Sequence, residues 1–145
     1  LITKTFSKIH GLASIRVGYG MASFLLIEML NRIRQPFNVN AVAQAMAALA
    51  ISDHEHINQS IELNTQQYKF LLDKLTKLGL DCIPSVGNFI TFRGDFVGNE
   101  MFHSLMEKGI IVRPVDLYEM QDFIRVTIGT EAENLQFLDA LKQLL

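Results

Sequence analysis

Short apolar segments separated by polar breaks occupy the start of the chain. Residues 1–6 are rich in β-branched and aromatic side chains and predict a strand, and residues 15–20 predict a second short strand that contains glycines near its end. Ser23 stands where a helix cap is expected, ahead of apolar residues that continue to Ile33. Pro36 ends this helix, because proline lacks the amide hydrogen that a helix interior needs. The pattern therefore predicts two strands followed by a helix.

Two further helices are expected next. Residues 41–51, with Asn40 as their cap, are rich in alanine, so that neighbouring elements can approach closely and we expect this helix to be buried. Residues 53–78 show apolar side chains at close to helical spacing, with Ser52 and Glu55 arranged as a capping box. At about 1.5 Å per residue this helix is roughly 40 Å long, and we expect it to connect two lobes.

After Gly79 the pattern changes to strands and helices in turn. We expect short strands at residues 81–84, 89–92, 110–113 and 123–128, and helices at residues 97–108 and beyond the cap Thr130. Gly79 and Gly109 each stand where a glycine ends a helix. The last helix is expected to present a stripe of leucines, Leu135, Leu138, Leu141 and Leu145. This order predicts a small sheet with helices on one face, and an α/β class for the chain.

Composition and charge limit the classes of protein that fit this pattern. The chain has 145 residues, is 49% hydrophobic and carries a formal net charge of −2, which indicates one globular domain or parts of two and excludes a disordered chain. Without a basic excess or an apolar stretch of roughly 20 residues, we expect neither nucleic acid nor a membrane as a partner. The single cysteine, Cys82, excludes an internal disulfide and favours a reducing compartment, the cytoplasm.

The residues around Lys8 are the strongest candidates for chemistry. Lys8 follows the first expected strand, with Thr5 and Ser7 before it and Gly11 after it. A lysine amine is a nucleophile when it is neutral or poised to react with a carbonyl, and a strand-end loop of small residues lets a cofactor approach the backbone. Together with Arg16, the two hydroxyls form a candidate phosphate site around the lysine. The same spacing also fits an exposed lysine and an ion-paired arginine.

Four segments resemble motifs of pyridoxal-phosphate-dependent aminotransferases, and of the histidinol-phosphate aminotransferase branch in particular. They occur in the family's order over nearly the whole chain, at residues 5–19 (the lysine motif), 35–44, 109–114 and 124–134. The resemblance implies an α/β fold of the fold-type-I transferase class, with a partial large domain and a small α/β domain. The implied boundaries are residues 1–52 for the end of the large domain, 53–78 for a connecting helix and 79–145 for the small C-terminal domain.

The resemblance also implies a role for each matching residue. Lys8 is expected to be the catalytic residue and to hold pyridoxal 5′-phosphate as a Schiff base. The cofactor phosphate is expected to be bound by the neighbouring polar residues Ser7, Thr5 and Arg16. Arg125 matches the family's arginine for the substrate anion, and Arg113 matches a second arginine near the substrate phosphate. Residues 116–120 depart from the family's glycine-rich loop, which lies near the substrate and affects specificity.

The implied function is amino-group transfer between histidinol phosphate and 2-oxoglutarate, in histidine biosynthesis, by an enzyme that is a homodimer when complete. The family's remaining cofactor contacts precede the lysine motif and are not recognisable here, so we expect this chain to be the C-terminal portion of such an enzyme. No metal is expected, since His54 and His56 point apart on a helix. Two alternatives stay open: a related decarboxylase of threonine phosphate, and a catalytically inert binding or dimerisation fragment.

Overall fold

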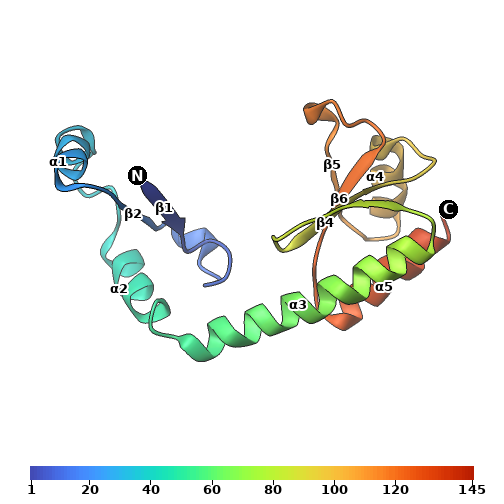
Figure 1. The fold of residues 1–145 in the computed structure, drawn as a ribbon, viewed down its shortest axis with the longest axis horizontal. Coiled ribbons are helices and arrows are strands. Elements are labelled where there is room, and N and C mark those ends of the chain that lie inside the picture. The colour runs from blue at the N-terminus through green and yellow to red at the C-terminus, as the bar shows by residue number, and fades with distance from the viewer. The chain divides into compact units, whose positions relative to one another are not determined.

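The computed structural model describes residues 1–145, which divide into two compact units, Leu1–Ile61 and Glu62–Leu145 (Figure 1). The first unit contains β1 (Ile2–Thr5), the 3-10 turn η1 (Ala13–Ile15), β2 (Gly18–Met21), α1 (Phe24–Ile33) and α2 (Ala41–Ala50). Helix α3 (His54–Lys77) begins in the first unit and ends in the second. The second unit continues with β3 (Asp81–Ile83), β4 (Phe89–Arg93), α4 (Gly98–Glu107), β5 (Arg113–Pro114), the 3-10 turn η2 (Asp116–Tyr118), β6 (Phe123–Thr127) and α5 (Glu131–Lys142). No helix is both long enough and apolar enough to cross a membrane.

β1 and β2 pair as antiparallel strands, with Thr5 opposite Gly18. A Cβ atom added at Gly18 would lie 2.7 Å from the carbonyl oxygen of Lys4, so the close approach of the two strands requires glycine. Both expected strands form, but the second begins at Gly18 rather than at residue 15. The reason is that Arg16 adopts a left-handed backbone with φ 59° at the end of η1, which interrupts extended structure.

α1 and α2 form where they were expected. The side chain of Asn40 accepts a hydrogen bond from the backbone N–H of Ala43 at 2.8 Å, which confirms Asn40 as the cap of α2. The expectation that α2 is buried is wrong for this chain, because only Ala43 and Ala47 are buried. No other element of the first unit covers the remaining faces of the helix, and Leu49 is 75% exposed.

α3 begins at His54 and uses a different cap from the expected one. The carboxylate of Asp53 accepts a hydrogen bond from the backbone N–H of His56 at 3.0 Å. Asp53, and not the expected pair of Ser52 and Glu55, therefore satisfies the free N–H groups of the first turn. The carboxylate of Glu55 instead accepts a hydrogen bond from a glutamine one turn further along the helix.

Glycine ends both α3 and α4, as the sequence predicts. Gly79 has φ +79° and Gly109 has φ +78°, a left-handed conformation that glycine adopts without steric cost. In each case the N–H of the residue after the glycine reaches the carbonyl oxygen five positions earlier, at 3.1 and 2.9 Å. This pattern of hydrogen bonds satisfies the last carbonyl groups of each helix and turns the chain toward the sheet.

The second unit is built on a four-stranded antiparallel sheet in the order β3-β4-β6-β5, with β4 and β6 side by side at its centre (Figure 1). One face is apolar, because alternate residues of the two central strands are buried: Ile90, Phe92, Ile124 and Val126. Buried residues of α3, α4 and α5 join the same core. The other residues of β4 and β6 therefore lie on an open face of the sheet.

β5 is shorter than the strand expected at residues 110–113. Only Arg113 and Pro114 pair with β6, as partners of Arg125 and Ile124. The physical reason is local, because the backbone N–H of Ile110 is used in the hydrogen bond that ends α4.

α5 begins with a complete capping box. The hydroxyl of Thr130 accepts a hydrogen bond from the N–H of Glu133, and the carboxylate of Glu133 accepts one from the N–H of Thr130. The expected leucine stripe is only half buried, since the core holds Leu138 and Leu141, whereas Leu135 and Leu145 are exposed. Phe137 and Asn134 are buried on the same helix, so its core face is rotated away from the outer leucines.

Candidate active site

The loop that follows β1 presents Lys8 at the surface of the first unit. The N–H of Gly11 donates to the carbonyl oxygen of Lys8 at 2.9 Å and closes a tight turn, and the N–H of Leu12 donates to the carbonyl oxygen of Phe6 at 2.9 Å. Gly11 has φ +68°, which few other residues adopt. The Lys8 side chain is exposed and has no carboxylate partner. The loop is therefore ordered by its backbone, while the amine at its tip stays available.

Ser7 and Arg16 belong to the same loop, and Thr5 is the last residue of β1 before it. The hydroxyl oxygen of Thr5 accepts a hydrogen bond from the backbone N–H of Ser7 at 3.0 Å, which sets the direction of the chain just before Lys8. Nη1 of Arg16 donates to the carbonyl oxygen of Ala13 at 2.6 Å, and no carboxylate pairs with this guanidinium. The Ser7 hydroxyl and the other N–H groups of Arg16 are therefore donors available to an anion.

A buried aromatic residue supports the base of this loop. Phe6 is 3% exposed, and its ring centroid lies 4.7 Å from that of His10 and 5.7 Å from that of Tyr19. Both distances fall in the range of ordinary aromatic contacts. Because Phe6 directly precedes Ser7 and Lys8, this packing fixes the start of the segment that carries the amine.

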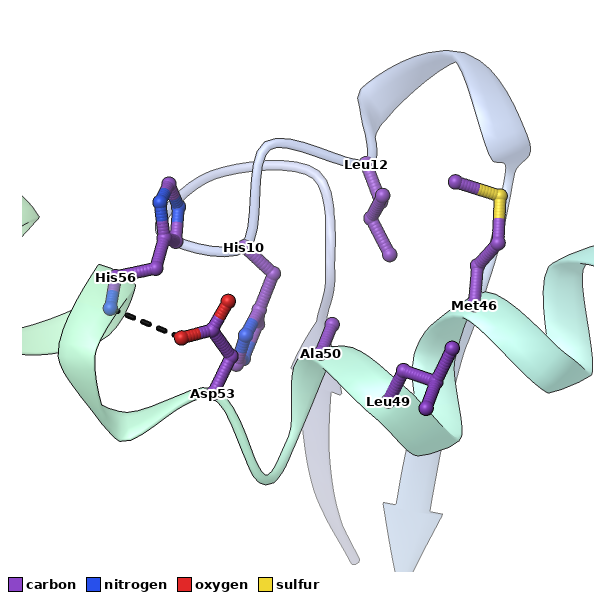
Figure 2. A pocket seen from close by; sticks show the side chains of 7 residues that line it. All are labelled: His10, Leu12, Met46, Leu49, Ala50, Asp53 and His56. Carbon is purple, nitrogen blue, oxygen red and sulfur yellow. Dashed lines mark hydrogen bonds between the residues drawn. The ribbon is translucent and has the colours of Figure 1, made fainter.

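A pocket of about 290 Å³ lies beside the Lys8 loop in the first unit. Seven side chains from the loop, from α2 and from the start of α3 line it: His10, Leu12, Met46, Leu49, Ala50, Asp53 and His56 (Figure 2). Nε2 of His56 lies 3.0 Å from the carbonyl oxygen of Ile9 and donates to it, which links the loop to α3. Nδ1 of His10 is buried without a hydrogen-bond partner.

The open face of the second unit's sheet carries Arg113 and Arg125. They are direct cross-strand partners on β5 and β6, and Thr91 is the partner of Arg125 on the other side, on β4. Like charges directly opposite each other destabilise a sheet, and neither arginine side chain has a carboxylate or a hydrogen-bond partner. Two unpaired guanidinium groups on neighbouring strands are suited to an anion that offers several acceptor oxygens.

Both central strands also place phenylalanines against arginines on this open face. The guanidinium carbon of Arg125 lies 4.6 Å from the ring centroid of Phe89. Arg93 differs from Arg125, because it stacks on Phe123 at 5.4 Å and also forms ion pairs with two carboxylates, Asp81 at 3.0 Å and Asp122 at 3.6 Å. Of these two stacked arginines, Arg125 is the one whose charge remains unbalanced.

Cys82, the single cysteine of the chain, is unsuited to nucleophilic chemistry. Burial, and to a smaller extent the negative charge of Asp81, raise the pKa of the Cys82 thiol. The thiol therefore stays protonated at neutral pH, and a thiol is a much weaker nucleophile than a thiolate.

The structure brings the sequence-predicted residues together in two groups. Ser7, Lys8 and Arg16 lie on the connection between β1 and β2 in the first unit, with Thr5 at the end of β1, and Arg113 and Arg125 are neighbours in the second unit. The contact of Phe89 with Arg125 was not predicted, although the alternation of residues along β4 places Phe89 on the face opposite Ile90. The contact of His56 with Ile9 has no local signal, because 47 positions separate the two residues.

Comparisons with known proteins identify the family of this chain. Residues 1–141 match the family model for aminotransferase class I and II. The histidinol-phosphate aminotransferase of Methylobacillus flagellatus is 47% identical over 145 residues, which cover all of this chain and 39% of that relative. The chain thus spans about two fifths of the length of the curated relatives it matches.

Solved structures show the same fold. The histidinol-phosphate aminotransferase from Clostridium acetobutylicum gives a TM-score of 0.91 at 26% identity, over 99% of this chain and 45% of that one. The histidinol-phosphate aminotransferase from Sinorhizobium meliloti, solved in complex with pyridoxal-5′-phosphate, gives a TM-score of 0.86 at 22% identity, over 99% of this chain and 41% of that one. This chain therefore has a fold-type-I architecture and belongs to the class I and II aminotransferase family.

Proposed function

We propose that the enzyme to which this chain belongs transfers an amino group from histidinol phosphate to 2-oxoglutarate, in histidine biosynthesis, with pyridoxal 5′-phosphate as its cofactor. Membership of the aminotransferase family and 47% identity to a histidinol-phosphate aminotransferase support this proposal. The observation that carries it is the Lys8 loop, in which an exposed, unpaired amine follows β1 and the same connection to β2 carries the Ser7 hydroxyl and the Arg16 guanidinium.

The donor set of this loop fits pyridoxal phosphate. The cofactor carries an aldehyde, which needs an amine, and a phosphate, which needs several hydrogen-bond donors and positive charge. Lys8 supplies the amine, and Thr5, Ser7 and Arg16 supply the donors. No acidic residue occurs in residues 5–19, so nothing in the loop repels a dianionic phosphate. When bound, the cofactor withdraws electrons from the substrate carbon that bears the amino group.

Lys8 and the two arginines then have separate roles in the proposed reaction. Nζ of Lys8 moves a proton between two carbon atoms: it removes the proton from the substrate carbon that bears the amino group and would deliver it to the aldehyde carbon of the cofactor. Arg125 binds the substrate anion and Arg113 binds the substrate phosphate, each through charge-assisted hydrogen bonds. The hydrogen-bonded turn from Lys8 to Gly11 limits the motion of the backbone that carries the amine.

The wider organisation is part of the proposal. We assign residues 1–52 to the large cofactor domain, 53–78 to a connecting helix and 79–145 to the small domain, as the C-terminal portion of the enzyme. The continuous helix α3 and the separate core of the second unit support this division. The family resemblance supports a homodimer, and the free thiol of Cys82 supports a cytoplasmic location.

The test of the catalytic assignment is Lys8→Ala in the full-length enzyme. We expect transamination to be abolished, because no other amine lies in this loop to move the proton. Lys4→Ala is the matched control, since Lys4 is exposed on β1 and precedes the loop. Borohydride reduction followed by peptide mapping should place the cofactor on Lys8 in the wild type. Near-normal turnover of Lys8→Ala, or a label on a different lysine, would remove Lys8 from the mechanism.

The same assay distinguishes the proposed reaction from its alternatives. Consumption of histidinol phosphate together with 2-oxoglutarate, at equal rates, supports amino-group transfer. Release of carbon dioxide from threonine phosphate without use of an oxo acid would instead indicate a decarboxylase. Absence of both reactions in a full-length protein that is loaded with cofactor would indicate a binding protein without this chemistry.

A further inference from the structure

The position of Arg125 on the open sheet face is defined by one aromatic contact. Arg125 on β6 has Thr91 and Arg113 as its cross-strand partners, and neither offers a negative charge. Its guanidinium carbon lies 4.6 Å from the ring centroid of Phe89, which is diagonally opposite it on β4. This distance is well within the range at which a cation and an aromatic face attract each other. Stacking on Phe89 is therefore the contact that orients this arginine.

The Phe89 ring is itself held by the turn that precedes β4. A Cβ atom added at Gly87 would lie 3.0 Å from Cε1 of Phe89, so the ring packs closely over the glycine backbone. The N–H of Gly87 donates to the hydroxyl of Ser85 at 3.1 Å, and its carbonyl oxygen accepts a hydrogen bond from Asn64 of α3 at 3.4 Å. The N–H of Ser85 in turn donates to the hydroxyl of Tyr68, also on α3, at 3.3 Å. Two side chains of α3 thus hold the turn on which the ring rests.

A stacked guanidinium group has a restricted set of directions for its hydrogen bonds. All five N–H groups lie in its plane, so a ring against one face leaves the edges of the group free. Restricting the side chain before binding also reduces the entropy that is lost when an anion is bound. The contact therefore favours recognition of a planar or multidentate anion at the edge of Arg125.

We propose that Phe89 is a positioning residue for substrate recognition, which holds the guanidinium group of Arg125 with its edge toward the substrate anion. This inference rests on the proposed function, because it takes Arg125 as the residue that binds the substrate. It extends that function by assigning a role to a side chain that carries no charge and donates no hydrogen bond. Gly87, Asn64 and Tyr68 act through Phe89 by holding the turn before it.

Arg93 and Phe123 provide a matched internal control on the same face. Arg93 stacks on Phe123 at 5.4 Å, but its charge is balanced by Asp81 and Asp122. Loss of the Phe123 ring therefore removes a similar stacking contact from an arginine that has no role in binding an anion. A difference between the Phe89 and Phe123 variants reports on the anion site and not on the sheet in general.

The test compares Phe89→Leu, Phe89→Tyr and Phe123→Leu in the full-length enzyme with cofactor bound. KM and kcat are measured for each substrate, and the affinity for inorganic phosphate is measured from its competition with substrate. We expect Phe89→Leu to raise KM by about 2- to 30-fold, the range that corresponds to a cation–π contact, with kcat changed much less. Phe89→Tyr keeps an aromatic ring at this position, so its KM should stay close to that of the wild type. Phe123→Leu should leave KM unchanged.

The outcomes separate this inference from the proposed function. If Arg125→Leu raises KM but Phe89→Leu does not, the positioning role of Phe89 is wrong and the substrate-binding role of Arg125 stands. If Phe123→Leu raises KM as much as Phe89→Leu, the effect comes from damage to the sheet and the inference is overturned. If Arg125→Leu leaves the KM for both substrates unchanged, the assignment of Arg125 to the substrate anion is wrong. The proposed role of Phe89 is then wrong as well.

Discussion

Three arginines share the open face of the second unit's sheet, and only one of them is paired with carboxylates. Arg93 has Asp81 and Asp122 as partners, whereas Arg113 and Arg125 have none. Placing two unpaired like charges opposite each other costs stability, and this cost supports the proposed role of the two residues in binding an anion. The difference in charge balance allows the role of each arginine to be tested separately.

Arg125→Leu should raise the apparent KM for the anionic substrates strongly. A hydrogen bond to a charged group is worth roughly 1.5–3 kcal/mol, which corresponds to about a 10- to 150-fold change. Arg113→Leu should weaken the binding of histidinol phosphate more than the binding of 2-oxoglutarate, because we assign Arg113 to the substrate phosphate. Steady-state kinetics with each substrate varied in turn measures both effects.

Arg93→Leu is the control, because it removes the same charge from the same face without removing an unpaired donor. Its KM values should stay close to those of the wild type. Equal losses for both substrates in Arg113→Leu would show that Arg113 does not distinguish the phosphate.

The placement of residues next to one another is predictable from sequence where the residues are neighbours in the chain. Thr5, Ser7 and Lys8 occur in one short segment, and their placement next to one another follows from that. The contact of Phe89 with Arg125 depends instead on the register of β4 against β6, which is set by the packing of the whole core. The same holds for Asn134, whose amide donates to Gln67 at 2.8 Å across 67 positions of sequence.

At the scale of elements, helix ends are the features most fully encoded in local sequence. Gly79, Gly109 and Thr130 were each predicted as helix boundaries, and each stands there with the expected hydrogen bonds. The cap of α3 was assigned to the wrong residue, because Ser52 and Asp53 are both good caps and the choice depends on the path of the preceding chain. The expected length of β5 is wrong because the backbone N–H of Ile110 is used in the hydrogen bond that ends α4, and the apolar pattern of residues 110–113 does not show this.

Thr130→Ala should destabilise the second unit by about 1 kcal/mol, the usual cost of losing a helix cap. The hydroxyl of Thr130 accepts the N–H of Glu133 and donates to its carboxylate, and the substitution removes both bonds. Gln136→Ala is the matched control, since this exposed residue lies on the same helix and alanine favours helices. Urea unfolding of each variant of the 145-residue chain at neutral pH measures the free energy of unfolding.

The destabilisation caused by Thr130→Ala should be smaller in acid than at neutral pH. Hydrogen bonds from the backbone N–H and then the hydroxyl of Thr130 lower the pKa of Glu133. A carboxyl group whose pKa is lowered by folding stabilises the protein above its ordinary pKa of about 4.3, and this stabilisation is lost as pH falls through the lowered value. The difference between the wild type and Thr130→Ala should therefore shrink in acid. A constant difference from neutral pH to pH values well below 4 would contradict this role of the ionised carboxylate.

At the scale of the whole chain, the two units differ in how much of their apolar surface they bury. The second unit has a continuous core that includes buried residues of two strands and three helices. In the first unit the buried residues are Phe6, Ala43 and Ala47, while Phe24 is 81% and Leu25 is 66% exposed. Burial of apolar surface is the main favourable term in folding, so the second unit should be much more stable on its own than the first.

We therefore expect the purified 145-residue chain to behave as a stable second unit joined to a weakly held first unit. Limited proteolysis should cut first within residues 1–61 and leave a fragment that contains residues 79–145, because cleavage requires local unfolding. The chain should also self-associate through the apolar surface around Phe24, Leu25 and Leu26, of which Leu26 is half-buried and the other two are exposed. Phe24→Glu should reduce this association, whereas Leu117→Glu, a change at a residue that is 89% exposed in the second unit, should not.

The same reasoning predicts weak cofactor binding by this chain alone. Lys8 and its neighbouring donors form the part of the proposed site that binds the aldehyde and the phosphate of the cofactor. The loop that carries them belongs to a unit with few buried residues. The loop is ordered only while this unit is folded, and a unit of low stability binds more weakly because the free energy needed to fold it opposes binding. We expect the 145-residue chain to take up pyridoxal phosphate poorly and to show no transamination of histidinol phosphate with 2-oxoglutarate. Titration of the cofactor by absorbance, followed by the activity assay, tests this expectation. Stoichiometric uptake with measurable turnover would show that the loop is fully organised within these 145 residues.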